Sequence, residues 1–448
     1  MEQITKPHCG ARLDRLPDCR WHSSMFAIVA FGLLVCWSNA VGGLILAQLK
    51  ALAWIDNSTT ATFSAITTAG MFLGALVGGI IGDKTGRRNA FILYEAIHIA
   101  SMVVGAFSPN MDFLIACRFV MGVGLGALLV TLFAGFTEYM PGRNRGTWSS
   151  RVSFIGNWSY PLCSLIAMGL TPLISAEWNW RVQLLIPAIL SLIATALAWR
   201  YFPESPRWLE SRGRYQEAEK VMRSIEEGVI RQTGKPLPPV VIADDGKAPQ
   251  AVPYSALLTG VLLKRVILGS CVLIAMNVVQ YTLINWLPTI FMTQGINLKD
   301  SIVLNTMSMF GAPFGIFIAM LVMDKIPRKT MGVGLLILIA VLGYIYSLQT
   351  SMLLITLIGF FLITFVYMYV CYASAVYVPE IWPTEAKLRG SGLANAVGRI
   401  SGIAAPYAVA VLLSSNGVTG VFILLFQLLS QLLSPPLELK PKVSPLKV

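Results

Sequence analysis

Apolar stretches of about 20 residues alternate with short polar turns along most of the chain. A helix rises about 1.5 Å per residue, so a stretch of about 20 residues crosses the apolar core of a bilayer. The pattern predicts twelve such helices, six on each side of a polar stretch at 203–263. The expected spans are 25–49, 63–82, 89–108, 112–136, 148–172 and 181–201, followed by 264–290, 302–323, 331–348, 352–377, 391–413 and 418–434.

These spans define the expected fold class, an all-α membrane protein with two six-helix bundles. The parts are a tail at 1–24, a first bundle at 25–202, a linker at 203–263, a second bundle at 264–434 and a tail at 435–448. Within the linker, the amphipathic stretch 214–227 predicts a helix at the membrane surface, and the proline-rich stretch 235–239 is typical of an extended segment.

Charged turns recur at nearly the same offset in the two halves. The sequence GIIGDKTGRR at 79–88 is answered by DKIPRK at 324–329, with the two aspartates 241 residues apart. EYMPGRNRG at 138–146 is answered by EIWPTEAKLRG at 380–390. Such repetition in an apolar chain is typical of secondary transporters that are built from two similar bundles.

Composition and charge narrow the function classes. Hydrophobic residues make up 55% of the chain and charged residues 12%, about half the share that is usual in soluble proteins. The formal charge of +12 does not indicate nucleic-acid binding, because the basic residues lie in short turns and form no stripe among aromatic residues. They occupy alternate turns, which predicts by the positive-inside rule that both termini and the linker are cytoplasmic. No cleavable signal peptide is indicated.

The sequence shows no motif for other kinds of chemistry. It has no glycine-rich phosphate loop, which argues against ATP-driven transport by this chain alone. We expect no enzymatic activity, no cofactor and no metal ion. His8, Cys9, Cys19 and His22 lack the ligand spacing of a zinc finger, and the cysteines within apolar runs are expected to pack as small apolar residues.

Four motifs, in this order, resemble the major facilitator superfamily, and within it the sugar-porter-like metabolite transporters. They are the segment 79–88, Arg118-x-x-x-Gly122-x-Gly124-x-Gly126, the segment 138–146 and Pro203-Glu204-Ser205-Pro206-Arg207. The nearest resemblance is to metabolite transport proteins of enteric bacteria. It implies two six-helix bundles that rock about a central substrate site, with proton symport as a common mode.

The charged turns are candidates for a gate at the cytoplasmic ends of the helices. We expect ion pairs between Glu138 and Arg145 and between Glu380 and Arg389. Ion pairs that join the bundles in only one state bias the rocking equilibrium. In the alternative interpretation, the basic turns only orient the helices. The candidate gating residues are Asp83, Arg87, Arg88, Glu138, Arg145, Asp324, Arg328, Glu380 and Arg389.

Arg118 lies about six residues inside its expected span, where a cation costs about 2.5–3.5 kcal/mol to insert. The resemblance implies an acidic partner on the first span, but the corresponding stretch 35–39 has no carboxylate. Three possibilities stay open: Arg118 pairs with Glu95, binds an anionic substrate, or extends toward the membrane surface as a structural residue. Glu95 and Arg118 enter from opposite ends and therefore differ in depth, which favours the anion.

Glu95 and His98 lie three residues apart on one helix face. A buried Glu–His pair can carry a proton near neutral pH, so these two are the candidate proton-coupling residues. In the alternative interpretation, His98 is a hydrogen-bonded core residue and Glu95 pairs with an arginine of a turn. Facilitated diffusion is the rival of proton symport.

The seventh span carries a predicted polar stripe, because Asn277, Tyr281 and Asn285 recur every four residues. Trp286 and Pro288 follow at an expected break of the helix. By the resemblance, Ala275, Met276, Tyr281 and Ala375 occupy positions where sugar porters bind sugar, which argues against a hexose. The candidate substrate-binding residues are Arg118, Asn157, Trp158, Asn277, Tyr281, Asn285, Trp286, Tyr369, Tyr372, Asn395 and Arg399.

The last span is unusually polar, since Gln427, Ser430, Gln431 and Ser434 interrupt it before two prolines. The codons permitted for 427–443, read one base earlier, can encode an apolar helix followed by Glu-Thr-Lys-Gly, which is the ending that the resemblance implies. The hypothesis is a frameshift just before Gln427. Sequencing of the coding DNA tests it, because a single-base change must restore that frame.

The sequence as a whole predicts a secondary transporter of a small metabolite, favouring an organic or aromatic anion, in a bacterial inner membrane. A transporter of a neutral sugar or polyol is the alternative substrate class. A non-transporting membrane sensor or a defective relic is the alternative of another kind. The expected partners are the substrate, the lipid bilayer and protons, with no nucleic acid, and the expected state is a monomer.

Overall fold

The computed structural model describes residues 7–17, 19–141, 145–240, 253–293, 295–323, 325–349, 351–383 and 386–433. The side chains of 133, 134, 145, 293, 387, 388 and 416–433 lie outside that description, as do Asp324 and the tail at 435–448. The frameshift hypothesis, the gating role of Asp324 and the side chain of Arg145 therefore remain predictions.

Every regular element in these ranges is a helix. The first half contains α1 (Cys9–Asp14), α2 (Arg20–Val35), α3 (Gly42–Ala51), α4 (Asn57–Thr85), α5 (Arg87–Ala106), α6 (Met111–Tyr139), α7 (Arg145–Asn157), α8 (Ser159–Leu170) and α9 (Ala176–Tyr201). The linker contains α10 (Pro206–Ser211), α11 (Tyr215–Thr233) and α12 (Tyr254–Leu257). The second half contains α13 (Gly260–Thr293), α14 (Leu298–Met309), α15 (Gly311–Val322), α16 (Arg328–Ser347), α17 (Met352–Cys371), the π-helix η1 (Tyr372–Tyr377), α18 (Val378–Glu380) and α19 (Lys387–Leu433).

Nine helical stretches in the described residues are long and apolar enough to cross a membrane. Two further expected spans are present as interrupted helices: the first is divided into α2 and α3, and the fifth into α7 and α8. The helix α19 continues without interruption through the expected eleventh and twelfth spans, so no non-helical residue separates them. The expected break at Pro288 is absent, because α13 runs through this proline to Thr293. The all-helical fold class is confirmed.

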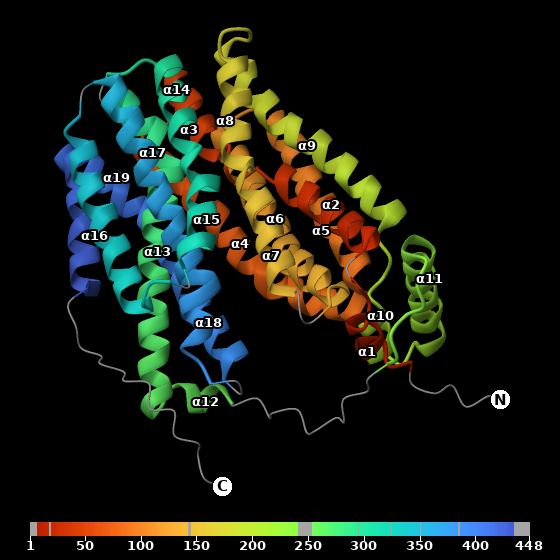
Figure 1. Cartoon of the computed structure of the whole chain (residues 1–448). Helices are drawn as coiled ribbons and strands as arrows, with labels where there is room; N and C mark the ends of the chain where they lie inside the picture. Colours follow the sequence, from red (N-terminus) through yellow and green to blue (C-terminus); the bar gives the residue numbers. More distant parts are fainter. Residues whose placement is uncertain are drawn as a thin grey trace.

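The two halves of the chain form two neighbouring groups of helices in Figure 1, one in red to yellow and one in green to blue. We call one end of the molecule the basic end, because Arg87, Arg88 and Arg328 start helices there and the linker helices α10 to α12 lie there. The other end, where α3, α8 and α14 lie, is called the opposite end. These two names are used below.

The most extensive contact between the two bundles is that of α4 with α19, and helices of the opposite end add further contacts. Gly43 of α3 packs so closely on α13 that a Cβ atom at this position would lie 2.5 Å from the carbonyl oxygen of Ile284. Asn305 of α14 donates a hydrogen bond to the hydroxyl of Ser164 on α8 (3.2 Å). An apolar cluster of Ala61, Trp286, Ile290, Val409, Ala410 and Leu413 adds helices α4, α13 and α19. These contacts close the space between the bundles at this end.

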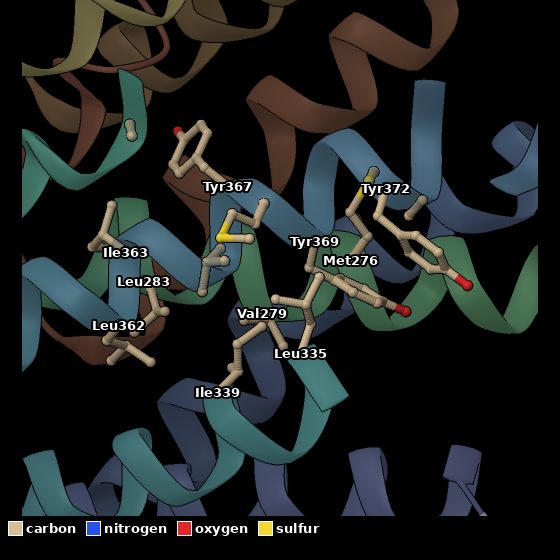
Figure 2. Close-up of a cluster of buried hydrophobic side chains, with 14 of the residues drawn as sticks. Met276, Val279, Leu283, Leu335, Ile339, Leu362, Ile363, Tyr367, Tyr369 and Tyr372 are labelled. Carbon is tan, nitrogen blue, oxygen red and sulfur yellow. The ribbon is translucent and has the colours of Figure 1, made fainter. Parts of the chain in front are cut away.

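Small residues allow close packing within each bundle. On α4 and α6, Gly74 and Gly126 face the backbone of the other helix, and a Cβ atom on either would lie about 2 Å from a carbonyl oxygen. Small residues at spacings of four are the usual way in which membrane helices approach each other closely. The core of the second bundle is formed by aliphatic side chains and tyrosines of α13, α16 and α17, such as Met276, Leu335 and Ile363 (Figure 2).

The N-terminal segment packs on the linker at the basic end. Leu13 and Leu16 are buried against Trp208 of α10 and against Met222 and Ile225 of α11. The apolar face of α11 is therefore covered by protein, which differs from the expected helix at the membrane surface. The reason is that the tail at 1–24 supplies an apolar helix that the linker can bury, and the periodicity of α11 alone does not distinguish this partner from lipid.

Candidate functional site

The interruption of the first span exposes backbone groups in the middle of the first bundle. Helix α2 ends at Val35, α3 begins at Gly42, and the residues between them are not helical. The carbonyl oxygen of Ser38 accepts a hydrogen bond from Nη1 of Arg118 on α6 (2.7 Å). Interrupted membrane helices are a common way to place backbone carbonyls and helix ends at a substrate or ion site.

Arg118 is surrounded by neutral groups. Its side chain is almost fully buried, with 1% exposed. Besides Ser38, it contacts the hydroxyl of Thr67 through Nε (3.2 Å), and its Cζ atom lies 4.6 Å from the centre of the Phe63 ring. No carboxylate pairs with it among the described residues, and it does not extend to the surface. Of the three possibilities, the pair with Glu95 and the arginine that extends outward are therefore not observed.

Glu95 and His98 form a second polar group directly beside this one. Both side chains are fully buried, and Oε2 of Glu95 lies 3.7 Å from Nδ1 of His98. Nε2 of His98 lies 2.7 Å from the hydroxyl of Ser38, so Ser38 contacts Arg118 with its carbonyl and His98 with its side chain. Both carboxylate oxygens of Glu95 are buried without a hydrogen-bond partner in the described part of the chain. An unpartnered carboxylate in the membrane interior is a candidate site for a proton or a cation.

The second bundle reaches this region through Asn285. A Cβ atom on Gly42 of α3 would lie 2.9 Å from Nη2 of Arg118 and 3.6 Å from Oδ1 of Asn285. The guanidinium of the first bundle and the amide of the second bundle therefore flank the same glycine. Glycine is required at position 42, because a side chain there would collide with the guanidinium of Arg118. The two bundles therefore approach each other beside the charge of Arg118.

The predicted polar stripe on α13 is buried along its whole length, with Asn277, Tyr281 and Asn285 all below 9% exposure. Asn277 donates its amide proton to the carbonyl of Leu273 on its own helix (2.7 Å). Tyr281 packs on Gly402 of α19, where a Cβ atom would lie 3.1 Å from its ring. The stripe therefore faces α19 at Asn277 and Tyr281 and faces the first bundle at Asn285.

Two predicted lining tyrosines lie within the second bundle. Tyr369 points its hydroxyl to the carbonyl of Val272 (3.3 Å), and Tyr372 packs on Gly332 of α16. Both belong to the cluster shown in Figure 2. Tyr372 also begins the π-helix η1, a type of helix that often occurs at functional sites. Trp286 is fully buried in the apolar cluster between the bundles at the opposite end.

The remaining predicted lining residues lie on α7, on α19 and at the interruption of the fifth span. Trp158 stands between α7 and α8, and its ring meets that of Phe310 between α14 and α15 (6.3 Å between centres). Two interrupted spans therefore meet across the bundles. The amide of Asn157 is bonded to Ser153 within α7. Asn395 is exposed and Arg399 half-buried. Asn395 lies about two helical turns before Gly402 and therefore shares its face, which at Gly402 meets Tyr281 of α13 and Thr68 of α4.

Four residues of this region were not predicted from the sequence. Ser38 and Thr67 bind Arg118, but single hydroxyl residues in apolar spans carry no distinctive signal. Tyr160 of α8 and Tyr367 of α17 meet across the bundles with ring centres 5.4 Å apart (Figure 2 shows Tyr367). Tyr160 and Tyr367 belong neither to the motifs nor to the predicted polar stripe, so no signal in the sequence distinguished them from other tyrosines in apolar spans.

The candidate gate of the first bundle is an extensive network. Arg87 binds Asp83 (2.7 Å) and Glu138 (2.9 Å), which joins α4, α5 and α6. Glu204, at the start of the linker, accepts hydrogen bonds from the backbone N–H groups of Arg87 (2.7 Å) and Arg88 (3.2 Å) and so caps α5. Arg88 donates to the carbonyl of Trp199 on α9 (2.6 Å). Glu138 pairs with Arg87, whereas its expected pair with Arg145 stays a prediction, because the side chain of Arg145 lies outside the description.

The candidate gate of the second bundle is described only in part, since Asp324 lies outside the described residues. Arg328 pairs with Glu380 (2.9 Å), which joins α16 and α18. Arg389 was the expected partner of Glu380, but its guanidinium stacks on Tyr254 of α12 (5.2 Å). The expected pair joined Glu380 to an arginine of its own loop, whereas the observed ion pair joins Glu380 to Arg328, at the start of α16. In both bundles the ion pairs that the structure shows join helices of the same bundle.

Comparisons with known proteins identify relatives of the whole chain. A model of the Major Facilitator Superfamily matches residues 23–406. The protein of Escherichia coli (strain K12) named "Putative metabolite transport protein YdjK" is 99% identical over 425 residues, which are 95% of this chain and 93% of that protein. The "Inner membrane metabolite transport protein YdjE" of the same organism is 44% identical over 95% of this chain and 93% of that protein.

More distant similarities agree with this family. The "Niacin transporter NiaP" of Acinetobacter baylyi (strain ATCC 33305 / BD413 / ADP1) is 25% identical over 92% of both chains. A solved structure of the xylose transporter XylE from E. coli, described as a partially occluded inward open conformation, superposes with a TM-score of 0.71. That match has 17% identity and covers 92% of this chain and 96% of that chain, so it supports the fold.

Proposed function

Because the chain belongs to the major facilitator superfamily and is a metabolite transporter of that family, we propose that it carries a small organic anion across the membrane by alternating access. The observation on which this depends is Arg118, a fully buried cation whose partners among the described residues are all neutral. Neutral acceptors such as the Ser38 carbonyl stabilise a buried guanidinium, but only an anion such as a bound carboxylate also neutralises its charge.

The position of Arg118 supports substrate binding. Nη2 of Arg118 and Oδ1 of Asn285 flank Gly42, so an anion at this place meets a charged donor from one bundle and a side-chain amide from the other, which donates to the anion once it turns its NH2 group inward. A substrate that contacts both bundles can bias their relative orientation, which is the requirement for coupling binding to rocking. One relative is named a niacin transporter, and niacin is a pyridine carboxylate. This name agrees with an aromatic anion as the substrate.

We infer that protons are carried together with the anion. Glu95 is fully buried on α5, both of its carboxylate oxygens lack a hydrogen-bond partner among the described residues, and His98, 3.7 Å away, reaches Ser38 and, through it, Arg118. An anion that enters with one proton moves no net charge, which avoids about 2.3 kcal/mol per charge for each 100 mV of opposing potential. Facilitated diffusion of the anion alone is the second candidate, supported by the absence of a carboxylate on the first span.

The structure supports a state that is closed at the opposite end. The bundles are joined there by Gly43 on Ile284 and by Asn305 on Ser164, and the gate ion pairs at the basic end stay within each bundle. We infer from the basic turns that this end faces the cytoplasm of a bacterial inner membrane and that both termini lie on that side. The gate ion pairs are then expected to join the two bundles when the opposite end opens.

A binding screen on the purified protein in detergent tests the substrate class. Small aromatic and aliphatic carboxylates are compared with xylose, glucose and inositol by thermal shift and by radioligand binding. We expect a carboxylate to bind, and Arg118→Gln to weaken it by about 30-fold or more, since removal of one partner of a buried charge pair costs about 2–5 kcal/mol. Arg181→Gln, which removes a half-buried arginine that is not among the candidate substrate-binding residues, is the matched control with a smaller effect. Tight sugar binding that survives Arg118→Gln establishes the alternative class instead.

A further inference from the structure

Three metal-binding side chains converge beside the interruption of the first span. Sγ of Cys36, Nδ1 of His98 and a carboxylate oxygen of Glu95 all lie within 4.8 Å of one another. The distance from Cys36 to His98 is 4.0 Å, and that from His98 to Glu95 is 3.7 Å. The ligands of a tetrahedral zinc ion lie about 3.3–3.6 Å apart, as its bond lengths of about 2.0–2.3 Å require. Small side-chain movements therefore bring the three atoms into coordination geometry.

The hydroxyl of Ser38 fixes the orientation of the imidazole. It lies 2.7 Å from Nε2 of His98, so this nitrogen can donate its proton to Ser38. The tautomer with the proton on Nε2 leaves the lone pair of Nδ1 directed at Cys36 and Glu95. A histidine that binds a metal usually donates its other N–H to an oxygen in this way, which selects the tautomer that can coordinate the ion.

Glu95 provides an independent observation that points to a ligand. Its side chain is fully buried, and both of its carboxylate oxygens lack a hydrogen-bond partner among the described residues. Coordination of a divalent cation by one thiolate and one carboxylate brings the net charge of the group to zero. A neutral group is the arrangement that a membrane interior tolerates best, since an isolated charge there is costly.

We propose that Cys36, Glu95 and His98 form a binding site for one zinc ion. One thiolate, one imidazole and one carboxylate are the three kinds of ligand that zinc accepts, whereas sodium, magnesium and calcium prefer oxygen ligands. Three protein ligands leave a fourth position for water. The ion links the unwound part of the first span to α5, and we expect it to hold these two elements in one relative position and so to inhibit transport.

Direct binding to the purified full-length protein tests this site without any transport assay. The metal-free protein is loaded with zinc and measured by elemental mass spectrometry, and Co²⁺ is used as a spectroscopic probe. We expect one zinc ion per chain and a thiolate-to-cobalt charge-transfer band in the near ultraviolet. Cys36→Ser is expected to remove that band, and Ser38→Ala to weaken affinity by about 10- to 100-fold, as is typical for the residue that orients a ligand.

A matched control is available in the N-terminal segment. Sγ of Cys19 lies 3.4 Å from Nδ1 of His22, and within the described residues no carboxylate completes that pair as a metal site. Cys19→Ser is expected to leave the zinc content and the cobalt band unchanged. A cobalt band that disappears in Cys19→Ser and persists in Cys36→Ser overturns the proposal.

The result remains decisive if Cys36→Ser does not fold. In that case, wild-type protein is alkylated with and without zinc, and the labelled peptides are identified by mass spectrometry. We expect zinc to protect Cys36 and not Cys163, a buried cysteine of α8. Absence of zinc binding in the wild type, or equal labelling of Cys36 with and without zinc, overturns the proposal. The proposed transport function is unaffected by either outcome, because binding is measured without substrate.

Discussion

The two bundles repeat one helix arrangement but have different interiors. The first bundle buries Glu95, His98 and Arg118 together. Among the described residues of the second bundle, the buried polar side chains are uncharged, and its core is aliphatic and tyrosine-rich (Figure 2). Under the proposed function, this difference assigns charge recognition and coupling to the first bundle, whereas the second bundle contributes amides and aromatic rings. A repeated fold therefore does not imply a repeated chemistry.

The same contrast appears at the basic end. In the first bundle, Arg87 binds two carboxylates and its helix is capped by Glu204, which ties the gate to the linker. In the second bundle, the structure shows the pair of Arg328 with Glu380, and the carboxylate of Glu380 is half exposed, at 49%. Exposed ion pairs contribute little, because water and salt screen them. We therefore expect substitutions in the first bundle to affect coupling, stability and the rate of substrate exchange more than substitutions in the second bundle.

The largest expected effect is on coupling. Glu95→Gln is expected to abolish accumulation of substrate driven by a pH gradient while substrate exchange continues, because glutamine cannot carry the proton. Uptake into proteoliposomes with and without a pH gradient measures this. Ser308→Ala in the second bundle, which removes a buried hydroxyl that bonds its own helix, is the control and is expected to preserve accumulation. Accumulation by Glu95→Gln equal to that of the wild type assigns coupling elsewhere.

The second effect concerns stability at the turn between α4 and α5. Gly86 has φ of 97° and ψ of 163°, a conformation that is essentially restricted to glycine. A Cβ atom there would also meet the carboxylate of Glu204. We expect Gly86→Ala to lower the free energy of unfolding by about 1–3 kcal/mol. The measurement is the thermal unfolding midpoint in detergent, with Gly334→Ala of α16, where a Cβ atom meets nothing within 4 Å, as the control. Equal midpoints for the two variants would contradict the strain argument.

Much of this fold could be predicted from the sequence, because spans of apolar residues and basic turns report directly on the membrane. The interruptions of the first and fifth spans could not, since Cys36 and Trp158 are apolar residues in apolar runs and their breaks depend on contacts with other helices. For the same reason Pro288 predicted a break that is absent: a proline near the end of a long helix is tolerated when the helix is packed on its neighbours.

The candidate site was only partly predictable. Buried charges such as Glu95 and Arg118 stand out in an apolar chain, and no ion pair joins these two in the described structure. Their connection through Ser38 depends on an unwound backbone that no periodicity reveals. Glu380 pairs with Arg328 of α16 and not with the expected Arg389, because this ion pair joins two helices whose contact the sequence pattern does not reveal.

The third effect compares the two gates directly. Glu138→Gln and Glu380→Gln each remove one carboxylate from a gate pair. The Arg87–Glu138 pair is more buried, with exposures of 17% and 21% against 31% and 49% for Arg328–Glu380. We expect Glu138→Gln to change the rate of substrate exchange by about fivefold and Glu380→Gln by about twofold or less, in line with values of up to about 1 kcal/mol for exposed pairs. A larger effect of Glu380→Gln would reverse the ranking of the two bundles.

The smallest effect is expected where the N-terminal segment binds the linker. Glu226 of α11 accepts hydrogen bonds from Arg12 (2.7 Å) and Arg15 (2.6 Å). Burial acts to raise the pKa of Glu226, but the hydrogen bonds and charges of the two arginines outweigh it and hold that pKa below the ordinary value of 4.5. A depressed pKa in the folded state means that the ion pairs stabilise docking fully above about pH 4.5. This stabilisation is lost as the pH falls through the folded-state pKa.

Hydrogen exchange of the amides of α1 tests this docking. At neutral pH we expect Glu226→Gln to speed exchange by about threefold, since an exposed or partly exposed pair contributes about 0.2–1 kcal/mol. After correction for intrinsic exchange, the difference between wild type and variant is expected to shrink as the pH falls below about 4.5, because the wild-type carboxylate is then protonated as well. Glu217→Gln is the matched control: it breaks the exposed pair with Arg214 on the same helix surface. Equal acceleration by both variants means that Arg12 and Arg15 do not hold α1 through Glu226.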